Sequence, residues 1–68
     1  MIDILINTEY IKLDQFLKLA NIIGTGGEAR LFIQENSILV NNEPEGRRGR
    51  KLRHGDIIKI KNEEYRIV

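Results

Sequence analysis

Residues 25–42, TGGEARLFIQENSILVNN, constrain the fold most, because helix, strand and turn signals follow one another there. Thr25 and Glu28 have the spacing of a capping box, in which the threonine hydroxyl accepts a backbone N–H and the glutamate reaches back. Apolar residues then recur at the i, i+3 and i+4 positions of one helix face, namely Ala29, Phe32 and Ile33. The pattern predicts a short amphipathic helix that begins at a glycine-containing turn.

The end of this helix leads directly into a strand and a tight turn. Asn36 stands where the helix should end, and asparagine tolerates the left-handed conformation that a C-terminal cap requires. Residues 38–40, Ile-Leu-Val, form an apolar run typical of a strand. Asn41-Asn42 has the composition of a two-residue hairpin turn. We therefore expect a helix, a left-handed cap and a β-hairpin in succession.

The outer face of the same helix carries residues suited to bind phosphate. Arg30 and Gln34 lie one helical turn apart, next to the free N–H groups of Gly26 and Gly27. A helix N-terminus carries about half a positive charge, and glycines let a phosphate approach it without a Cβ in the way. The alternative is that these glycines only form the turn between two helices. The basic segment GRRGRK follows the hairpin at residues 46–51, so helix start and basic loop together indicate binding to a phosphate backbone.

Composition excludes several classes of function. The chain has 68 residues and a net charge of +1, so bulk charge alone does not bind it to nucleic acid. It has no cysteine, which excludes cysteine-based zinc sites, and its single histidine, His54, cannot form a metal site unaided. No Ser/His/Asp set or carboxylate pair indicates catalysis, so we expect a non-enzymatic protein without a cofactor. No apolar run could span a bilayer and no signal peptide opens the chain, which predicts a cytoplasmic protein.

The charges are unevenly distributed along the chain. Residues 1–34 hold three cations and four anions, whereas residues 35–68 hold eight cations and six anions. Five of those eight cations are close together in sequence: Arg47, Arg48, Arg50, Lys51 and Arg53. Such a group repels itself unless a polyanion lies nearby, although Glu43 and Glu45 can neutralise part of it in the free protein. Arginine suits bidentate phosphate binding and stacking on bases, so we expect nucleic-acid contact here rather than a merely solvated loop.

The segment before residue 25 predicts a strand and a first helix. Residues 1–6 place isoleucines on alternate positions, the pattern of a strand with one buried side, and a brief extended segment can follow at residues 10–11. A helix is predicted from Lys12 or Leu13 to Asn21. Its core stripe recurs at helical spacing: Leu13, Phe16, Leu17 and Ala20. Residues 24–27 then separate the two helices, which we expect to pack as a helical hairpin.

The segment after the hairpin predicts one polar loop and two further strands. Pro44 should interrupt strand pairing, and residues 45–53 should form a polar loop anchored by Leu52. Residues 54–56 have turn composition, with Asp56 bracing the turn, and strands are predicted at residues 57–61 and 65–68. We therefore expect one α+β domain over residues 1–68, with two short packed helices against a small, mostly antiparallel sheet whose terminal strands are adjacent.

Residues 12–60 resemble the S-four-type RNA-binding domain, named after a small-subunit ribosomal protein and also called the alpha-L motif. The markers are the LDxFL opening at residues 13–17, Glu28-Ala29-Arg30 in the second helix, the ILVNN hairpin, and Gly55-Asp56 before an apolar strand. The length, TGGEAR and RRGRK are most similar to the small stand-alone YaaA/YbcJ-like members. The chain departs from many relatives at Lys12, where they have arginine, and at residues 25–27, where they have a Ser-Arg-type helix entry.

This resemblance implies a fold, a ligand and a binding surface. Such domains bind structured RNA, commonly ribosomal or transfer RNA, through the two helices and the adjoining loop, so the ribosomal subunit is an expected partner. We expect a monomer without membrane contact. The predicted RNA-binding residues are Lys12, Lys18, Thr25, Gly26, Gly27, Arg30, Gln34, Arg47, Arg48, Arg50, Lys51 and Arg53. The aromatic residues are expected to contribute little, with Phe16 and Phe32 in the core and Tyr10 and Tyr65 not placed for base stacking.

Two alternatives belong to other classes of function. The opening strand, ILVNNEP and HGDIIKI are also similar to ubiquitin-like sulfur carriers of the β-grasp type. Those carriers need a C-terminal Gly-Gly whose carboxylate is activated, whereas this chain ends in Arg66-Ile67-Val68. The other alternative is a protein-interaction adaptor whose basic loop docks on an acidic partner, and its binding would persist at high salt.

Overall fold

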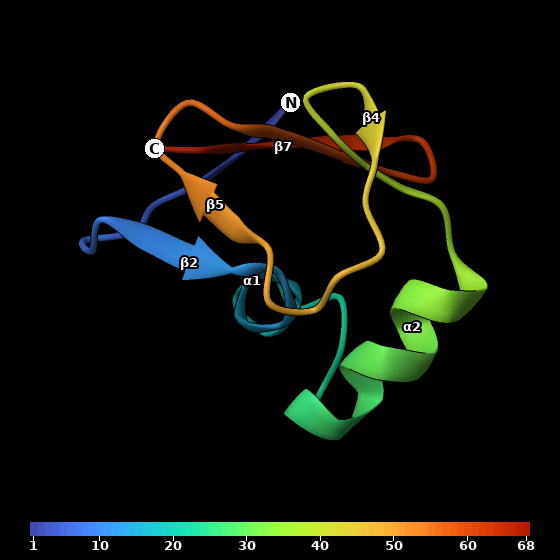
Figure 1. Cartoon of the computed structure of the whole chain (residues 1–68). Helices are drawn as coiled ribbons and strands as arrows, with labels where there is room; N and C mark the ends of the chain where they lie inside the picture. The colour runs from blue at the N-terminus through green and yellow to red at the C-terminus, as the bar shows by residue number, and fades with distance from the viewer.

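The computed structural model describes residues 1–68 and contains two short helices on one side of a five-stranded sheet (Figure 1). The strands in spatial order are β1 (Ile2–Ile4), β7 (Glu63–Ile67), β6 (Ile57–Ile60), β3 (Ile38–Val40) and β4 (Glu43–Pro44). The pair β1–β7 is parallel, and the other three pairs are antiparallel. The helices are α1 (Leu13–Leu19) and α2 (Ala29–Glu35). The predicted α+β class, the mostly antiparallel sheet and the adjacent terminal strands are confirmed.

A separate two-stranded ribbon joins β2 (Tyr10–Lys12) to β5 (Lys51–Arg53). The prediction of a polar loop through residue 53 is therefore wrong at its C-terminal end. The physical reason is Leu52, which is completely buried and lies opposite the partly buried Ile11 in the antiparallel register. Extended backbone is needed to turn Leu52 inward while its two neighbours face solvent.

The core is formed by thirteen buried residues from both helices, the sheet and the ribbon. Leu13, Phe16 and Leu17 of α1 are completely buried, which confirms the predicted stripe of the first helix. The Phe16 ring meets Tyr65 edge-on, with 5.5 Å between ring centroids and an interplanar angle of 83°. Phe32 of α2 is only partly buried, so it contributes less to the core than its position in the pattern predicted. No helix is long and apolar enough to cross a membrane.

The left-handed cap predicted at Asn36 is wrong, because Asn36 is extended with φ −128° and ψ 147°. The chain continues directly into β3, and the Asn36 Nδ2 donates to the Phe32 carbonyl at 3.0 Å. The left-handed asparagine is instead Asn21, with φ 62°, at the end of α1. There the Asn21 N–H donates to Lys18 O and the Ile22 N–H to Leu17 O, which is the Schellman pattern.

The hairpin predicted at Asn41-Asn42 is confirmed. Both asparagines have positive φ, 52° and 69°, as a type I′ turn requires, and Val40 lies opposite Glu43. Pro44 does not interrupt the pairing, because it lies opposite Leu39 in the edge strand β4, where no outward N–H is needed.

The turns on either side of β6 determine where the strands begin and end, and some of these limits differ from the prediction. Asp56 Oδ2 accepts the Arg53 N–H at 2.8 Å, so the predicted bracing of the turn at residues 54–56 is confirmed. The following turn lies at residues 61–62, so Lys61 is not part of the strand predicted at residues 57–61; it takes the left-handed conformation with φ 56°. As a result β6 ends at Ile60 and β7 begins at Glu63. The first strand is also shorter than predicted, because β1 spans only Ile2–Ile4.

Candidate nucleic-acid interface

The basic loop, residues 46–50 between β4 and β5, is organised around one carboxylate. Glu45 accepts backbone N–H groups from Gly46 at 3.1 Å and Arg47 at 3.0 Å. It also accepts Arg47 Nε at 3.0 Å and Arg50 Nη1 at 2.7 Å, and its side chain is only 5% exposed. The hydrogen bonds from Arg47, opposed by desolvation and assisted by Arg50, lower the pKa of Glu45 from its ordinary 4.5 to about 2.

This carboxylate divides the predicted cations of the loop into two groups. Arg47 and Arg50 are paired with Glu45, so part of their charge is neutralised within the protein. Arg48 is exposed and forms no salt bridge. The expected partial neutralisation by Glu45 is confirmed, whereas Glu43 forms no ion pair at all.

The loop is also attached to the first helix through main-chain bonds. The Leu13 N–H donates to the Arg50 carbonyl at 2.8 Å, and the Asp14 N–H donates to the Arg48 carbonyl at 3.0 Å. These donors belong to the first turn of α1, whose N–H groups have no partner within the helix. Lys12 is the N-cap and supplies no side-chain cap, so the loop carbonyls perform that function. The loop therefore has a fixed position relative to α1, which sequence patterns did not reveal.

The outer face of the β2–β5 ribbon is basic and contains one aromatic ring. Tyr10 lies opposite Arg53 and Lys12 lies opposite Lys51, and all four residues are exposed. The Lys51 Nζ is 4.8 Å from the centroid of the Tyr10 ring, and the Arg53 Cζ is 5.6 Å from it. Tyr10 was not among the predicted site residues. The signal that could have found it is the repeated pattern of one apolar residue between two polar ones, in residues 10–12 and again in residues 51–53.

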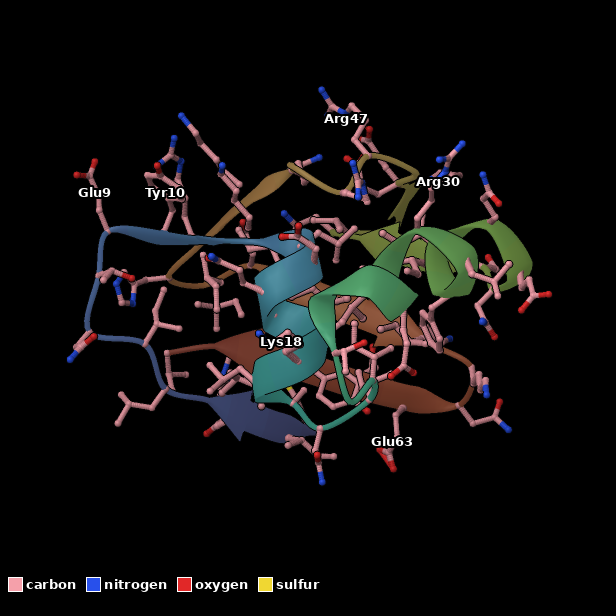
Figure 2. All side chains as sticks on the ribbon, turned by 90° about the horizontal axis from the view of Figure 1, so that it is seen from below. Glu9, Tyr10, Lys18, Arg30, Arg47 and Glu63 are labelled. Atoms are coloured by element: carbon pink, nitrogen blue, oxygen red, sulfur yellow. The ribbon has the colours of Figure 1, made fainter.

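The second helix contributes its outer face to the same side of the molecule. Arg30 and Gln34 are exposed, and none of the three salt bridges involves Arg30. Figure 2 shows Arg30, Arg47 and Tyr10 projecting from the same side, opposite Glu63. We call this side the basic surface: Lys12, Arg30, Gln34, Arg47, Arg48, Arg50, Lys51 and Arg53.

The other predicted residues surround the entrance to the second helix. Residues Gly26–Glu28 form a 3-10 turn, η1, that leads into α2, and the predicted capping box is present. Glu28 Oε1 accepts the Thr25 N–H at 3.1 Å, so a carboxylate of the protein already lies at this entrance. A Cβ added to Gly26 would lie 3.9 Å from Lys18 Cδ, which places Lys18 beside the turn. Lys18 lies apart from Arg30 and Arg47 in Figure 2.

The arrangement suits electrostatic binding of an extended anion. Beside the loop lies an open hollow of about 660 Å³ with no hydrophobic residue in its lining, which consists of four cations, Gly49 and one carboxylate, Asp56. The four cations are Arg47, Arg50, Lys51 and Arg53. The structure contains no group of three or more His, Asp or Glu side chains placed to hold a metal ion. Positive side chains and exposed backbone around an open hollow bind phosphates in succession rather than enclosing a small molecule.

Comparison with known proteins identifies the family of this chain. A family model described as S4 domain matches residues 4–68. The chain is also 56% identical over 55 residues to a protein of Bacillus subtilis (strain 168) named probable ribosome maturation protein RlbA. The matched segment covers 81% of this chain and 78% of that protein. The chain therefore belongs to the S4 domain family, the S-four type that its motifs resemble.

Proposed function

We propose that this protein binds structured ribosomal RNA through the basic surface and acts in ribosome maturation in the cytoplasm. The observation that carries the proposal is a set of exposed cations on one side of the molecule without acidic partners: Lys12, Arg30, Arg48, Lys51 and Arg53. Unpaired cations release counterions from a phosphate backbone when they bind it, and this release drives association.

The family and the relative support the choice of ligand. The relative is named a probable ribosome maturation protein, and the S4 domain match covers nearly the whole chain. A ribosomal RNA offers both A-form helices and exposed loops, which arginine contacts through phosphates and base faces. The role we propose is binding without catalysis.

The positions of the cations suggest how the RNA is held. The loop and the β2–β5 ribbon supply Arg48, Lys51 and Arg53 along one path, and Arg30 supplies a contact from α2. The loop keeps its shape through Glu45 and the start of α1, so these side chains are positioned before binding. The entrance at residues 25–27, with Lys18, would contact the RNA only where it extends past α2.

Salt dependence of binding tests the proposal directly. Purified ribosomal RNA is titrated with the protein at several salt concentrations. If four or five phosphates are neutralised, log K should fall against log salt with a slope of about −3 to −4.5. Binding that is absent at low salt, or a flat salt response, would overturn the proposal.

A matched variant distinguishes binding by the basic surface from attraction by the overall charge of the protein. Lys59 lies on β6 between the buried Ile58 and Ile60, so it projects from the face of the sheet that points away from the core. Replacing Lys59 with Gln removes one charge and should leave the slope unchanged, whereas Arg48→Gln should make it shallower by about one unit. The rival adaptor function predicts a protein partner that remains bound at high salt.

A further inference from the structure

We propose that Tyr10 is a stacking site for one unpaired base of the bound RNA, an inference that rests on the proposed function and deepens it. The site consists of the Tyr10 ring with Lys51 and Arg53 beside it on the outer face of the β2–β5 ribbon. Charge alone would bind any phosphate backbone. A stacked base would make the surface prefer RNA with an exposed base over a continuous duplex.

Tyr10 makes no contribution to the core that would account for an aromatic ring at this position. Ile11 turns its side chain inward against Leu52, so the neighbouring Tyr10 faces outward and is 36% exposed. Tyr65 shows the contrasting case, because its ring packs edge-on against the buried Phe16. Of the two tyrosines, one is a core residue and the other lies among cations on the surface.

The strand that carries the ring is held in a defined place before any ligand binds. The Thr8 hydroxyl donates to the Tyr10 carbonyl at 2.9 Å, and His54 Nε2 lies 2.8 Å from the Thr8 carbonyl oxygen. The register with Arg53 fixes the strand on its other side. A ring on a strand that is already ordered requires no ordering of the backbone on stacking, which favours binding.

Replacing a cation on the Tyr10 ring with a stacked base is favourable in free energy. Lys51 and Arg53 contact the Tyr10 ring at 4.8 Å and 5.6 Å from its centroid. These exposed cation–π contacts are weaker than base–aromatic stacking. An arriving base displaces a cation from the ring, and that cation then pairs with a phosphate of the same strand.

The surroundings provide space for both parts of a nucleotide. The basic hollow next to the loop is lined by Lys51 and Arg53 on one side of the ribbon. A second open hollow of about 520 Å³ lies beside β2 and is lined in part by Tyr10, Lys12 and Gln15. Tyr10 thus lines the second hollow, beside Glu9, while the two cations that contact its ring line the first.

The central experiment compares three proteins on purified ribosomal RNA. Tyr10→Leu should weaken binding by about 5- to 150-fold, the range that loss of one base–aromatic stack produces. Tyr10→Phe should bind like the wild type, because the ring is retained. The salt slope of Tyr10→Leu should equal that of the wild type, because stacking releases no counterions. Lys51→Gln, in contrast, should make the slope shallower by about one unit.

Heparin, a polyanion without bases, separates stacking from an indirect effect on the cations. If Tyr10 only positioned Lys51 and Arg53, Tyr10→Leu would weaken heparin binding as well as RNA binding. We expect heparin affinity to be unchanged. A parallel loss on both polyanions would overturn the stacking site while leaving the RNA-binding function intact.

Ultraviolet crosslinking of the unmodified protein does not depend on any variant folding. Irradiation of the wild-type complex with ribosomal RNA, followed by mass spectrometry, should find a nucleotide attached to the peptide that contains Tyr10. Tyr65→Phe serves as the control and should keep that adduct. Salt-sensitive RNA binding with adducts only elsewhere would overturn the Tyr10 proposal alone, whereas no RNA binding would overturn both proposals.

Discussion

The basic loop at residues 46–50 and the helix entrance at residues 25–27 each place a glutamate against backbone N–H groups, but the consequences differ. Glu45 is almost completely covered and pairs with two arginines as well as with the loop backbone. Glu28 is exposed and accepts the Thr25 N–H at a helix start. The first carboxylate shapes a cationic loop, whereas the second accepts from Thr25 and places a negative charge at the helix entrance, which disfavours a phosphate there.

The difference shows that the number of cations in a segment overstates the charge available to a ligand. Two arginines of the loop are committed to Glu45, while Arg48 in the same loop has no acidic partner. The ion pairs with Glu45 reduce the positive charge that the loop can offer to a ligand, but they also fix the shape of the loop. At the helix entrance the glycines are exposed and no cation is paired, but the Glu28 carboxylate repels an incoming anion.

The largest effect is expected from a substitution that unfolds α1, the helix that supports both the basic loop and the helix entrance. The first turn of α1 donates its N–H groups to the loop carbonyls, and Lys18 in the last turn of α1 lies beside the entrance. Leu17→Ala should cost about 2–5 kcal/mol, comparable to the whole stability expected of a domain of this size. Circular dichroism should therefore show an unfolded chain. Leu19→Ala is the control on the same helix, because Leu19 is 54% exposed, and its variant should melt close to the wild type.

The next effect distinguishes the two glutamates. Glu45→Gln and Glu28→Gln each remove one negative charge, so charge counting predicts that both strengthen RNA binding equally. We expect Glu45→Gln to lower stability by about 1–3 kcal/mol, because it weakens several charge-assisted hydrogen bonds, and to weaken RNA binding as the loop loses its shape. Glu28→Gln should cost about 1 kcal/mol or less and bind RNA at least as tightly as the wild type. Equal behaviour in melting and titration experiments would refute the comparison.

Acid should affect the loop through the same carboxylate. The pKa of Glu45 is lowered to about 2 in the folded protein, below its ordinary 4.5. The unfolded chain therefore binds more protons between these values, so this stabilisation is complete above pH 4.5 and is lost as the pH falls through 2. Urea titrations should show that the stability difference between wild type and Glu45→Gln shrinks over this interval. A difference that stays constant from pH 6 to pH 2 would contradict the assignment.

A smaller effect concerns binding alone. Arg30→Ala and Arg48→Gln remove cations without acidic partners, so their melting temperatures should match the wild type while RNA binding weakens. If one RNA contacts both residues, the double variant should deviate from additivity by more than about 0.5 kcal/mol. Additive losses would indicate two independent sites. Arg50→Gln is the contrasting variant, and it should also lower the melting temperature because it removes a partner of Glu45.

The smallest effect tests how closely RNA approaches the loop backbone. A Cβ added to Gly49 would meet nothing within 4 Å, so Gly49→Ala should change stability by no more than about 0.5 kcal/mol. RNA affinity should also be unchanged if side chains make the contacts. A loss of affinity at constant melting temperature would show that a phosphate lies against the main chain at this position.

Local signals in the sequence predicted most of the fold. The capping box at residues 25–28, the core stripe of α1 and the asparagine hairpin depend on neighbouring residues, and all three are present. Asn36 was misassigned because two asparagines follow helices and only tertiary context decides which one turns the chain. At Asn21 the chain reverses with a left-handed residue, whereas at Asn36 it runs straight into β3.

The candidate site was harder to predict because it depends on pairing between distant segments. The cations of residues 47–53 are evident in the sequence, but their division by Glu45 requires side-chain geometry. Tyr10 is far from Lys51 and Arg53 in the chain, and only the register of β2 with β5 brings them together. Short strands of three residues carry too weak a pattern to reveal such pairing.

The parallel contact between β1 and β7 has a consequence for the order of folding. Ile2 lies opposite Tyr65, so the first strand has no partner until β7 has been synthesised. Pairing between the two ends of a chain has the highest loop-closure cost, and such long-range contacts slow folding. The two helices and the β3–β4 hairpin can form while the chain is still emerging, but the β1–β7 pair closes the sheet last. Until that closure the edge of β7 that pairs with β1 stays open, and this interval is when the protein is most exposed to aggregation.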